Sequence, residues 1–81
     1  MITDEQLKRN LSRNLKKTLD IQGLTPYRLA KMVDEPQTSV YRIVRGENVP
    51  NAVLLARMAE ALDVTVDSLL QSARKRAAIS A

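Results

Sequence analysis

The residues of this chain that could take part in chemistry are hydrogen-bonding side chains. Gln37, Thr38, Tyr41 and Arg42 recur at the spacing of one face of a helix. Glutamine can make paired hydrogen bonds to adenine and arginine to guanine, while a threonine methyl group or an aromatic ring can contact the methyl group of thymine. This set of side chains therefore suits the recognition of base edges in a major groove.

The composition excludes several other kinds of site. Cysteine and histidine are both absent from the 81 residues. Disulfides and thiolate metal sites are thereby excluded, and so is the commonest catalytic base and metal ligand. The sequence also has no nucleophile–base pair and no glycine-rich phosphate loop. We therefore expect that the chain is not an enzyme and that it uses no cofactor and no metal.

Two short helical patterns must position the hydrogen-bonding residues. Helix starts are marked by Thr25 with Pro26 and again by Pro36, which predicts helices over about 26–32 and 36–45. Each helix has an apolar face at the spacing of a half-buried helix. These faces consist of Leu29, Ala30 and Val33 in the first helix, and of Val40, Ile43 and Val44 in the second. The two faces can pack together, with Gln37, Thr38, Tyr41, Arg42 and Arg45 turned outward and Ser39 at the boundary.

Three further helices are expected around this pair. A capping box from Thr3 to Gln6 starts the first, and Gly23 ends it. Asn51 and Thr65 cap the last two helices, and Asp63 ends the earlier of these two. The residues expected in the core are Leu7, Leu11, Leu15, Leu19 and Ile21 in the first helix, Leu55, Met58, Ala59 and Leu62 in the fourth, and Leu69 and Leu70 in the fifth.

The order of these residues resembles the Cro and lambda-repressor-like (XRE-type) helix-turn-helix family. The resemblance is carried by Leu-Thr-x-x-x-Leu-Ala at 24–30, by Gln-x-Ser-Val-x-x-Ile-x-x-Gly at 37–46, and by Pro50. It implies an all-α fold, a compact five-helix lambda-repressor-like DNA-binding domain with the helix-turn-helix at helices 2 and 3. Residues 1–71 would form this domain, and residues 72–81 would form a basic C-terminal tail, either flexible or extending the last helix.

The chain departs from the family pattern at several positions. The family usually has glycine where Asp34 stands, an apolar residue where Glu35 stands, and often glutamate where Val44 stands. Aspartate tolerates left-handed backbone better than most residues, so we expect the turn to survive with some strain. Pro26 replaces a glutamine that often binds phosphate in the family, so that contact is missing here.

The resemblance implies two groups of DNA contacts. Contacts to bases are expected from Gln37, Thr38, Tyr41 and Arg42. Contacts to phosphates are expected from Tyr27, Arg28, Ser39, Arg45, Gly46, Asn48, Arg13 and Lys16. For Tyr27, a partly buried ring that covers the junction of the two helices is an equal alternative. Glu47 places a negative charge beside the expected DNA.

The function that the resemblance implies is sequence-specific DNA binding by a transcriptional regulator, a repressor of phage, plasmid or bacterial type. It would bind a palindromic operator as a homodimer through Val66, Leu70 and Leu54, although a role inside the core suits Val66 and Leu70 equally. Two alternatives stay open. The chain could be an antitoxin that binds a toxin and represses its own operon, or a helical adaptor that binds another protein.

The charge of the chain and its apolar segments fit this function. A net charge of +4 and a pI near 9.9 favour acidic partners such as nucleic acid or an anionic membrane surface. No apolar run approaches the roughly 20 residues that span a bilayer, and the N-terminus lacks the pattern of a signal peptide. We therefore expect a cytoplasmic, nucleoid-associated protein without a membrane partner.

Overall fold

The computed structural model describes residues 2–72. This part of the chain holds five helices and no strand: α1 (Asp4–Gln22), α2 (Pro26–Met32), α3 (Gln37–Val44), α4 (Ala52–Leu62) and α5 (Val66–Leu70). The predicted all-α, five-helix fold is confirmed. Within the described range no helix combines the length and the apolar character that crossing a membrane requires. The predicted basic tail lies outside the described residues, apart from Ser72.

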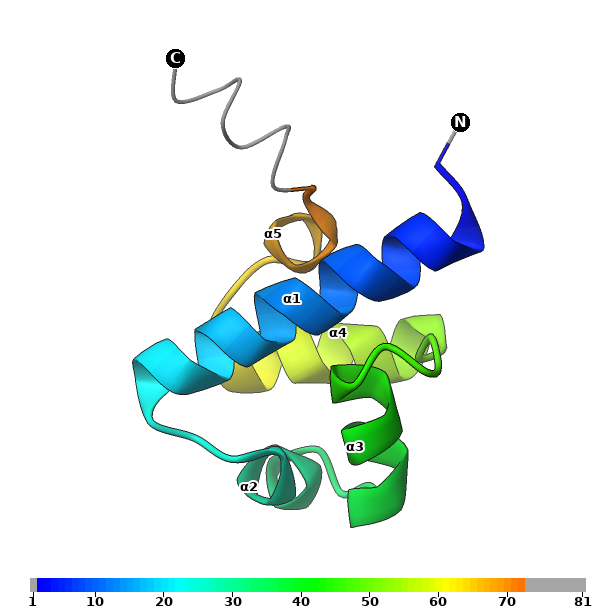
Figure 1. The fold of residues 1–81 in the computed structure, drawn as a ribbon. Helices are drawn as coiled ribbons and strands as arrows, with labels where there is room; N and C mark the ends of the chain where they lie inside the picture. Colours follow the sequence, from blue (N-terminus) through cyan, green and yellow to red (C-terminus); the bar gives the residue numbers. More distant parts are fainter. Residues whose placement is uncertain (1, 73–81) are drawn as a thin grey trace.

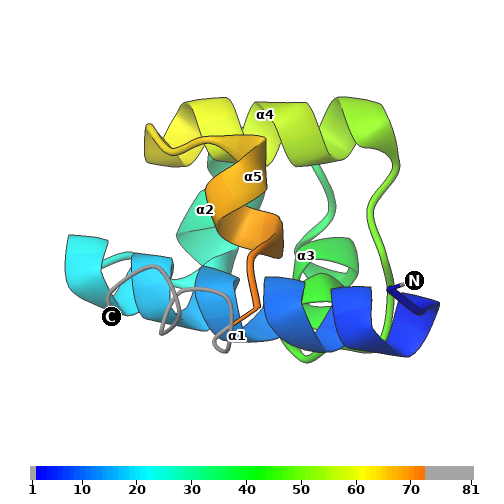
Figure 2. The ribbon, with the colours of Figure 1, turned by 90° about the horizontal axis from the view of Figure 1, so that it is seen from above.

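The helices surround a single core, with α1 and α4 on opposite sides. Figure 1 shows α1 crossing in front of α4, with α5 above and the α2–α3 pair below. The view from above in Figure 2 separates α1 from α4 and places α5 between them. α1 packs against α3 and α5, while α4 packs against α2 and α5, and α2 packs closely on α3. The α2–α3 pair is thus held from both sides.

The core consists of apolar side chains from all five helices. Its fully buried large members are Leu11, Leu15, Leu29, Val40, Met58, Leu62 and Leu69. The predicted core of α1 is confirmed at its centre, but Leu7 is only half-buried and Ile21 is 74% exposed. Ile21 lies on the α1 face of Lys17 and Thr18, where it lines an open hollow with Val64 and Ser68 instead of entering the core.

The predicted core face of α4 is confirmed at Met58, Ala59 and Leu62, whereas Leu55 packs against the core but is only partly buried. Leu54 is buried, with 9% of its surface exposed, whereas Leu55 is half-buried. Leu54, Met58 and Leu62 follow one another at four-residue intervals, so they form one stripe along the helix. Leu55 lies one position further round the helix, at the edge of this stripe. In α5, Leu69 is buried and Leu70 is half-buried.

Local signals set the ends of the helices. The side chains of Thr3, Thr25, Asn51 and Thr65 each accept a hydrogen bond from an amide in the first turn of the helix that follows, at 2.8–3.1 Å. The capping box is complete, because the Thr3 amide donates to the Gln6 side chain. α3 is the exception, since Pro36 stands just before it and provides no side-chain cap. The predicted start at Pro36 is therefore one residue early.

Within residues 2–72, left-handed backbone occurs at four positions, each just after a helix or its last turn. Gly23 and Gly46 have φ of 68° and 81°, and Asp34 and Asp63 have φ of 57° and 56°. The predicted C-terminal cap at Gly23 and the predicted left-handed Asp34 are both confirmed. A side chain in this region brings Cβ close to the following carbonyl oxygen, so Asp34 carries backbone strain inside the α2–α3 turn.

Polar side chains of α1 hold the end of α5. Asn14 Nδ2 donates to the carbonyls of Leu69 at 2.7 Å and Gln71 at 2.8 Å, and Asn14 is only 3% exposed. Asn10 Nδ2 donates to the Leu70 carbonyl at 3.3 Å, and Arg13 donates to the Gln71 carbonyl at 3.1 Å. The last carbonyls of a helix lack partners within it, so these bonds fix the position of α5 on α1.

Replacing Asn14 tests this role. We expect Asn14→Ala to lower the free energy of unfolding by about 1–3 kcal/mol, because the buried Leu69 carbonyl loses its donor. Asn10→Ala is the matched control, and it should cost less than about 1 kcal/mol because its bond is longer and only partly buried. Urea denaturation monitored by circular dichroism measures both values. Equal losses in the two variants would contradict the role given to Asn14.

Replacing Asp34 tests the strain in the turn. We expect Asp34→Gly to raise the free energy of unfolding by roughly 0.5–1 kcal/mol, since glycine adopts positive φ without steric cost but loses more chain entropy. Asp67→Gly, in the first turn of α5, should lower it, because glycine is a poor helix former and the positive end of the helix loses a carboxylate. The same denaturation curves compare the two variants. A loss of stability in both would show that Asp34 is not strained.

Candidate nucleic-acid interface

The outward face of α3 is the candidate interface. Its side chains point outward because the opposite face of the helix is buried in the core. Val40, Ile43 and Val44 are 0–6% exposed, as the sequence predicts. On the opposite side Gln37, Thr38, Arg42 and Arg45 are exposed, while Ser39 and Tyr41 are half-buried. These residues form one continuous hydrogen-bonding surface along the helix.

Both ends of α3 are fixed. At its C-terminal end, Ser12 Oγ of α1 donates to the Val44 carbonyl at 2.6 Å. At its N-terminal end, the turn is closed by the Glu35 amide, which donates to the Ala30 carbonyl of α2 at 3.0 Å. Figure 1 shows α3 rising from this turn toward α1. Gln37 and Thr38 therefore lie at the end of α3 that is distant from α1.

The first turn of α3 is open to an acceptor from outside. Pro36 precedes the helix, and no side chain caps it. The Ser39 amide donates to the Pro36 carbonyl at 3.1 Å, whereas the amides of Gln37 and Thr38 have no partner within the helix and carry a partial positive charge. Gln37 and Thr38 thus combine exposed side chains with the positive end of a helix, which suits an approach toward negatively charged DNA.

α2, which packs on α3, contributes a small basic cluster. Arg28 is exposed, and Tyr27 has 46% of its surface exposed. Lys31 Nζ lies 4.9 Å from the centre of the Tyr27 ring, a cation–π contact one helical turn away. Lys31 was missed in the sequence analysis, although its four-residue spacing from Tyr27 was the available signal. The contact orients Tyr27 along α2 and leaves the ring partly accessible.

The segment after α3 offers fewer donors than expected. The Gly46 amide already donates to the Ile43 carbonyl at 3.0 Å, and the Glu47 amide donates to the Arg42 carbonyl at 2.9 Å. Arg45 Nε lies 3.3 Å from Glu47 Oε2 in an exposed ion pair. The side chain of Asn48 is exposed and can still donate to a phosphate.

The basic residues of α1 divide between two sides. Arg13 donates to Asn10 Oδ1 and to the Gln71 carbonyl, so it lies on the side of α5. Lys16 is exposed. A shallow hollow at the end of α3 is lined instead by Glu5, Lys8, Arg9 and Ser12 of α1 with Arg45 and Gly46. The α1 cations that adjoin α3 are thus Lys8 and Arg9, which the sequence analysis did not assign.

The residues expected at a dimer interface occupy different environments. Val66 and Leu70 are half-buried at the edge of the core, and Leu54 belongs to the core itself. The exposed apolar side chain nearest to Leu54 in sequence is Val53, with 61% of its surface exposed. The structure therefore keeps Val66 and Leu70 on the surface but places Leu54 inside.

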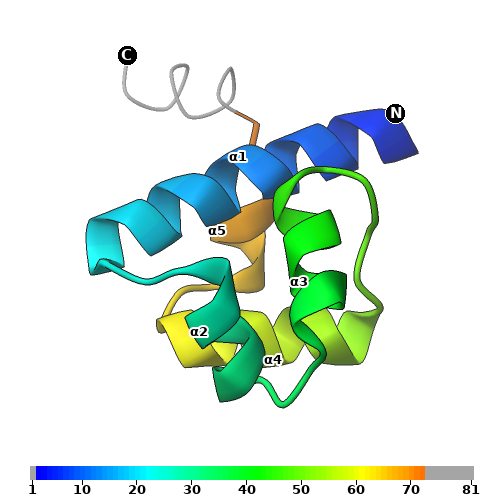
Figure 3. The same cartoon turned by 60° about the horizontal axis from the view of Figure 1, so that its bottom comes forward.

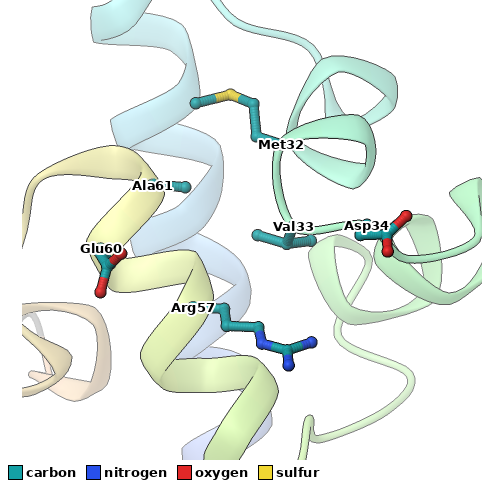
Figure 4. A pocket seen from close by; sticks show the side chains of 6 residues that line it. All are labelled: Met32, Val33, Asp34, Arg57, Glu60 and Ala61. Atoms are coloured by element: carbon teal, nitrogen blue, oxygen red, sulfur yellow. The ribbon is translucent and has the colours of Figure 1, made fainter.

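A second hollow lies behind the turn, between α2 and α4. It is lined by Met32, Val33, Asp34, Arg57, Glu60 and Ala61. Figure 4 shows Arg57 extending from α4 toward the turn, while the Asp34 carboxylate points away from α4. None of the outward residues of α3 lines this hollow. It is therefore separate from the candidate interface.

Comparison with known proteins agrees with this geometry. A protein-family model described as Helix-turn-helix (HTH_3) matches residues 15–69. No match was found among curated protein sequences. Among solved structures, the hypothetical transcription factor NHTF from Neisseria superposes with a TM-score of 0.85 at 22% identity, over 98% of this chain and 91% of that one.

A second solved structure, the HTH_3 family transcriptional regulator from Vibrio cholerae, superposes with a TM-score of 0.76 at 24% identity. The match covers 83% of this chain but only 38% of the Vibrio protein. At these identities the two structures establish a shared fold, and the family match covers more than half of the chain. The chain therefore belongs to the HTH_3 family of XRE-type helix-turn-helix proteins, a family of DNA-binding transcriptional regulators.

Proposed function

We propose that this protein is a sequence-specific transcriptional regulator that reads the major groove of DNA with α3. The observation that carries the proposal is the division of α3 into a buried face and an exposed hydrogen-bonding face. A helix that enters the groove by its N-terminal end brings its first residues to the base edges. Gln37 and Thr38 occupy this position, with Tyr41 and Arg42 one turn further on.

The remaining polar residues position the domain on the duplex. Arg28 and Tyr27 of α2, and Ser39, Arg45 and Asn48 at and after α3, are exposed or half-buried and can contact phosphates. Such contacts hold the register and supply the salt-dependent part of the affinity, but they carry no sequence information directly. We assign no catalytic step to any residue.

The regulator would act in the cytoplasm as a homodimer on a palindromic operator. Two copies of α3 would then lie about 34 Å apart, one turn of DNA. Val66 and Leu70 are candidates for the contact between subunits because both are apolar and only half-buried. Occupation of a promoter by such a dimer would repress transcription.

Removing the reading side chains tests base recognition. The double variant carries Gln37→Ala and Thr38→Ala. We expect its preference for a selected duplex over a scrambled one to fall by roughly 1–3 kcal/mol for each base contact that is lost. Both side chains are exposed, so folding should be unaffected. Competition gel shifts with the two duplexes measure the preference.

Arg28→Gln is the comparison variant for this experiment. Loss of the Arg28 guanidinium should weaken binding to both duplexes by the same factor, because a phosphate contact does not depend on the base sequence. An unchanged preference in the Gln37 and Thr38 variant would contradict the proposed reading role of α3.

Replacing Val66 tests the subunit contact. We expect Val66→Glu to shift the protein toward the monomer, because a charged side chain would enter an apolar interface. Glutamate suits the first turn of α5, but Val66 also packs against the core, so circular dichroism checks that the variant stays folded. Sedimentation equilibrium measures the assembly, and Val53→Glu on α4 is the matched control. Dissociation by the Val53 variant alone would place the interface on α4 instead.

A further inference from the structure

We propose that the N-terminal half of α1 adds a phosphate-binding site to the interface, formed by Lys8 and Arg9 beside the end of α3. The site would take a phosphate of the DNA backbone, so the inference rests on the proposed function. Residues 4–14 of α1 precede the segment that matches the family. Lys8 and Arg9 therefore lie outside the matched segment, whereas Arg45 and Gly46 lie within it.

The site is built by one face of α1 against the Arg45–Gly46 end of α3. Glu5, Lys8 and Arg9 recur at three-residue and four-residue spacing, and together with Ser12 they line the hollow described above. Figure 3 shows the N-terminal half of α1 running past the end of α3 and the start of the segment that follows. Arg45 belongs both to this hollow and to the outward face of α3, so the hollow continues the candidate interface.

The walls of the hollow are held in place. Ser12 is buried, and its hydroxyl donates to the Val44 carbonyl at 2.6 Å. Gly46 approaches α1 so closely that a Cβ atom there would lie 3.4 Å from Ser12 Cβ. Since α1 and α3 are fixed at this point, the stems of Lys8, Arg9 and Arg45 start from defined positions, and their charged groups can converge on one anion.

The basic side chains of the hollow are available to a phosphate of bound DNA. Lys8 Nζ lies 3.6 Å from Glu5 Oε1, and Arg45 pairs with Glu47. Arg9 is exposed, and its guanidinium has no hydrogen bond or ion pair within residues 2–72. Exposed ion pairs of this kind are weak, so a phosphate can compete with Glu5 for Lys8. Arg9 is therefore the best single probe of the site.

The salt dependence of DNA binding tests the site. We expect Arg9→Gln to reduce the slope of log K against log salt by about 0.9, the value for one phosphate contact. At 0.1 M salt this corresponds to roughly an eightfold loss of affinity, equal for a selected and a scrambled duplex. Lys17→Gln is the matched control, because it removes the same charge from the α1 face that adjoins Val64 and Ser68. Fluorescence anisotropy at several chloride concentrations measures the slopes.

Removing the Glu5 carboxylate from the hollow is an independent test, in which the affinity for DNA should rise. Glu5→Gln should tighten binding to both duplexes, because Lys8 loses its intramolecular partner. Asp20→Asn changes the net charge equally at the other end of α1 and should have a smaller effect. Equal slopes for Arg9→Gln and Lys17→Gln, or equal affinities for Glu5→Gln and Asp20→Asn, would overturn the site.

Two further outcomes separate this inference from its alternatives. If wild type prefers the selected duplex but Arg9→Gln behaves as Lys17→Gln does, only the phosphate site fails. If wild type shows no preference, the proposed sequence-specific function fails, while a smaller salt slope for Arg9→Gln than for Lys17→Gln would still support the phosphate site. The last experiment adds inorganic phosphate at matched ionic strength. If phosphate inhibits DNA binding by wild type but not by Arg9→Gln, the hollow binds the free anion, and the proposed contact with the DNA backbone is wrong.

Discussion

The burial of Val40, Ile43 and Val44 is the constraint on which the rest of this structure depends. An isolated helix of eight residues is not stable in water, because forming its first turn costs more than so few hydrogen bonds return. Packing against α1 and α2 therefore holds α3 in a helical conformation. The same packing decides which side chains point outward, so one apolar stripe defines the surface that is available for recognition.

α1 acts as the frame of the domain, and its faces have separate roles. Its leucines fill the core, Asn10 and Asn14 hold the end of α5, and Ser12 holds the end of α3. This division explains why the basic residues of one helix differ in role. Arg13 points to α5, whereas Lys8 and Arg9 adjoin α3. A count of positive charge along α1 would not distinguish them.

Much of the fold could be predicted because its signals are local. Thr3, Thr25, Asn51 and Thr65 each stand directly before a helix that they cap, and the periodicity of Val40, Ile43 and Val44 identifies the inward face of α3. Leu54 and Leu55 are adjacent leucines of one helix, so periodicity alone could not decide which is buried. That choice depends on the angle at which α4 meets its neighbours.

The parts of the site that sequence reasoning missed depend on contacts between distant residues. Nothing near Arg13 indicates that it bonds to Gln71, and nothing near Gly46 indicates that it lies against Ser12. Both contacts arise only when α1 is placed across α3 and α5. The outward residues of α3 could be predicted because they follow from the helix itself, whereas the surrounding donors could not.

The most direct measurement of the central claim is the selection of bound sequences from a pool of random duplexes by the wild-type protein. If α3 reads base edges, repeated selection enriches one short motif, and a dimer enriches it as an inverted repeat with centres about one helical turn apart. A pool that stays random after repeated selection, although the protein binds it, would contradict the claim that the outward face of α3 discriminates between base pairs.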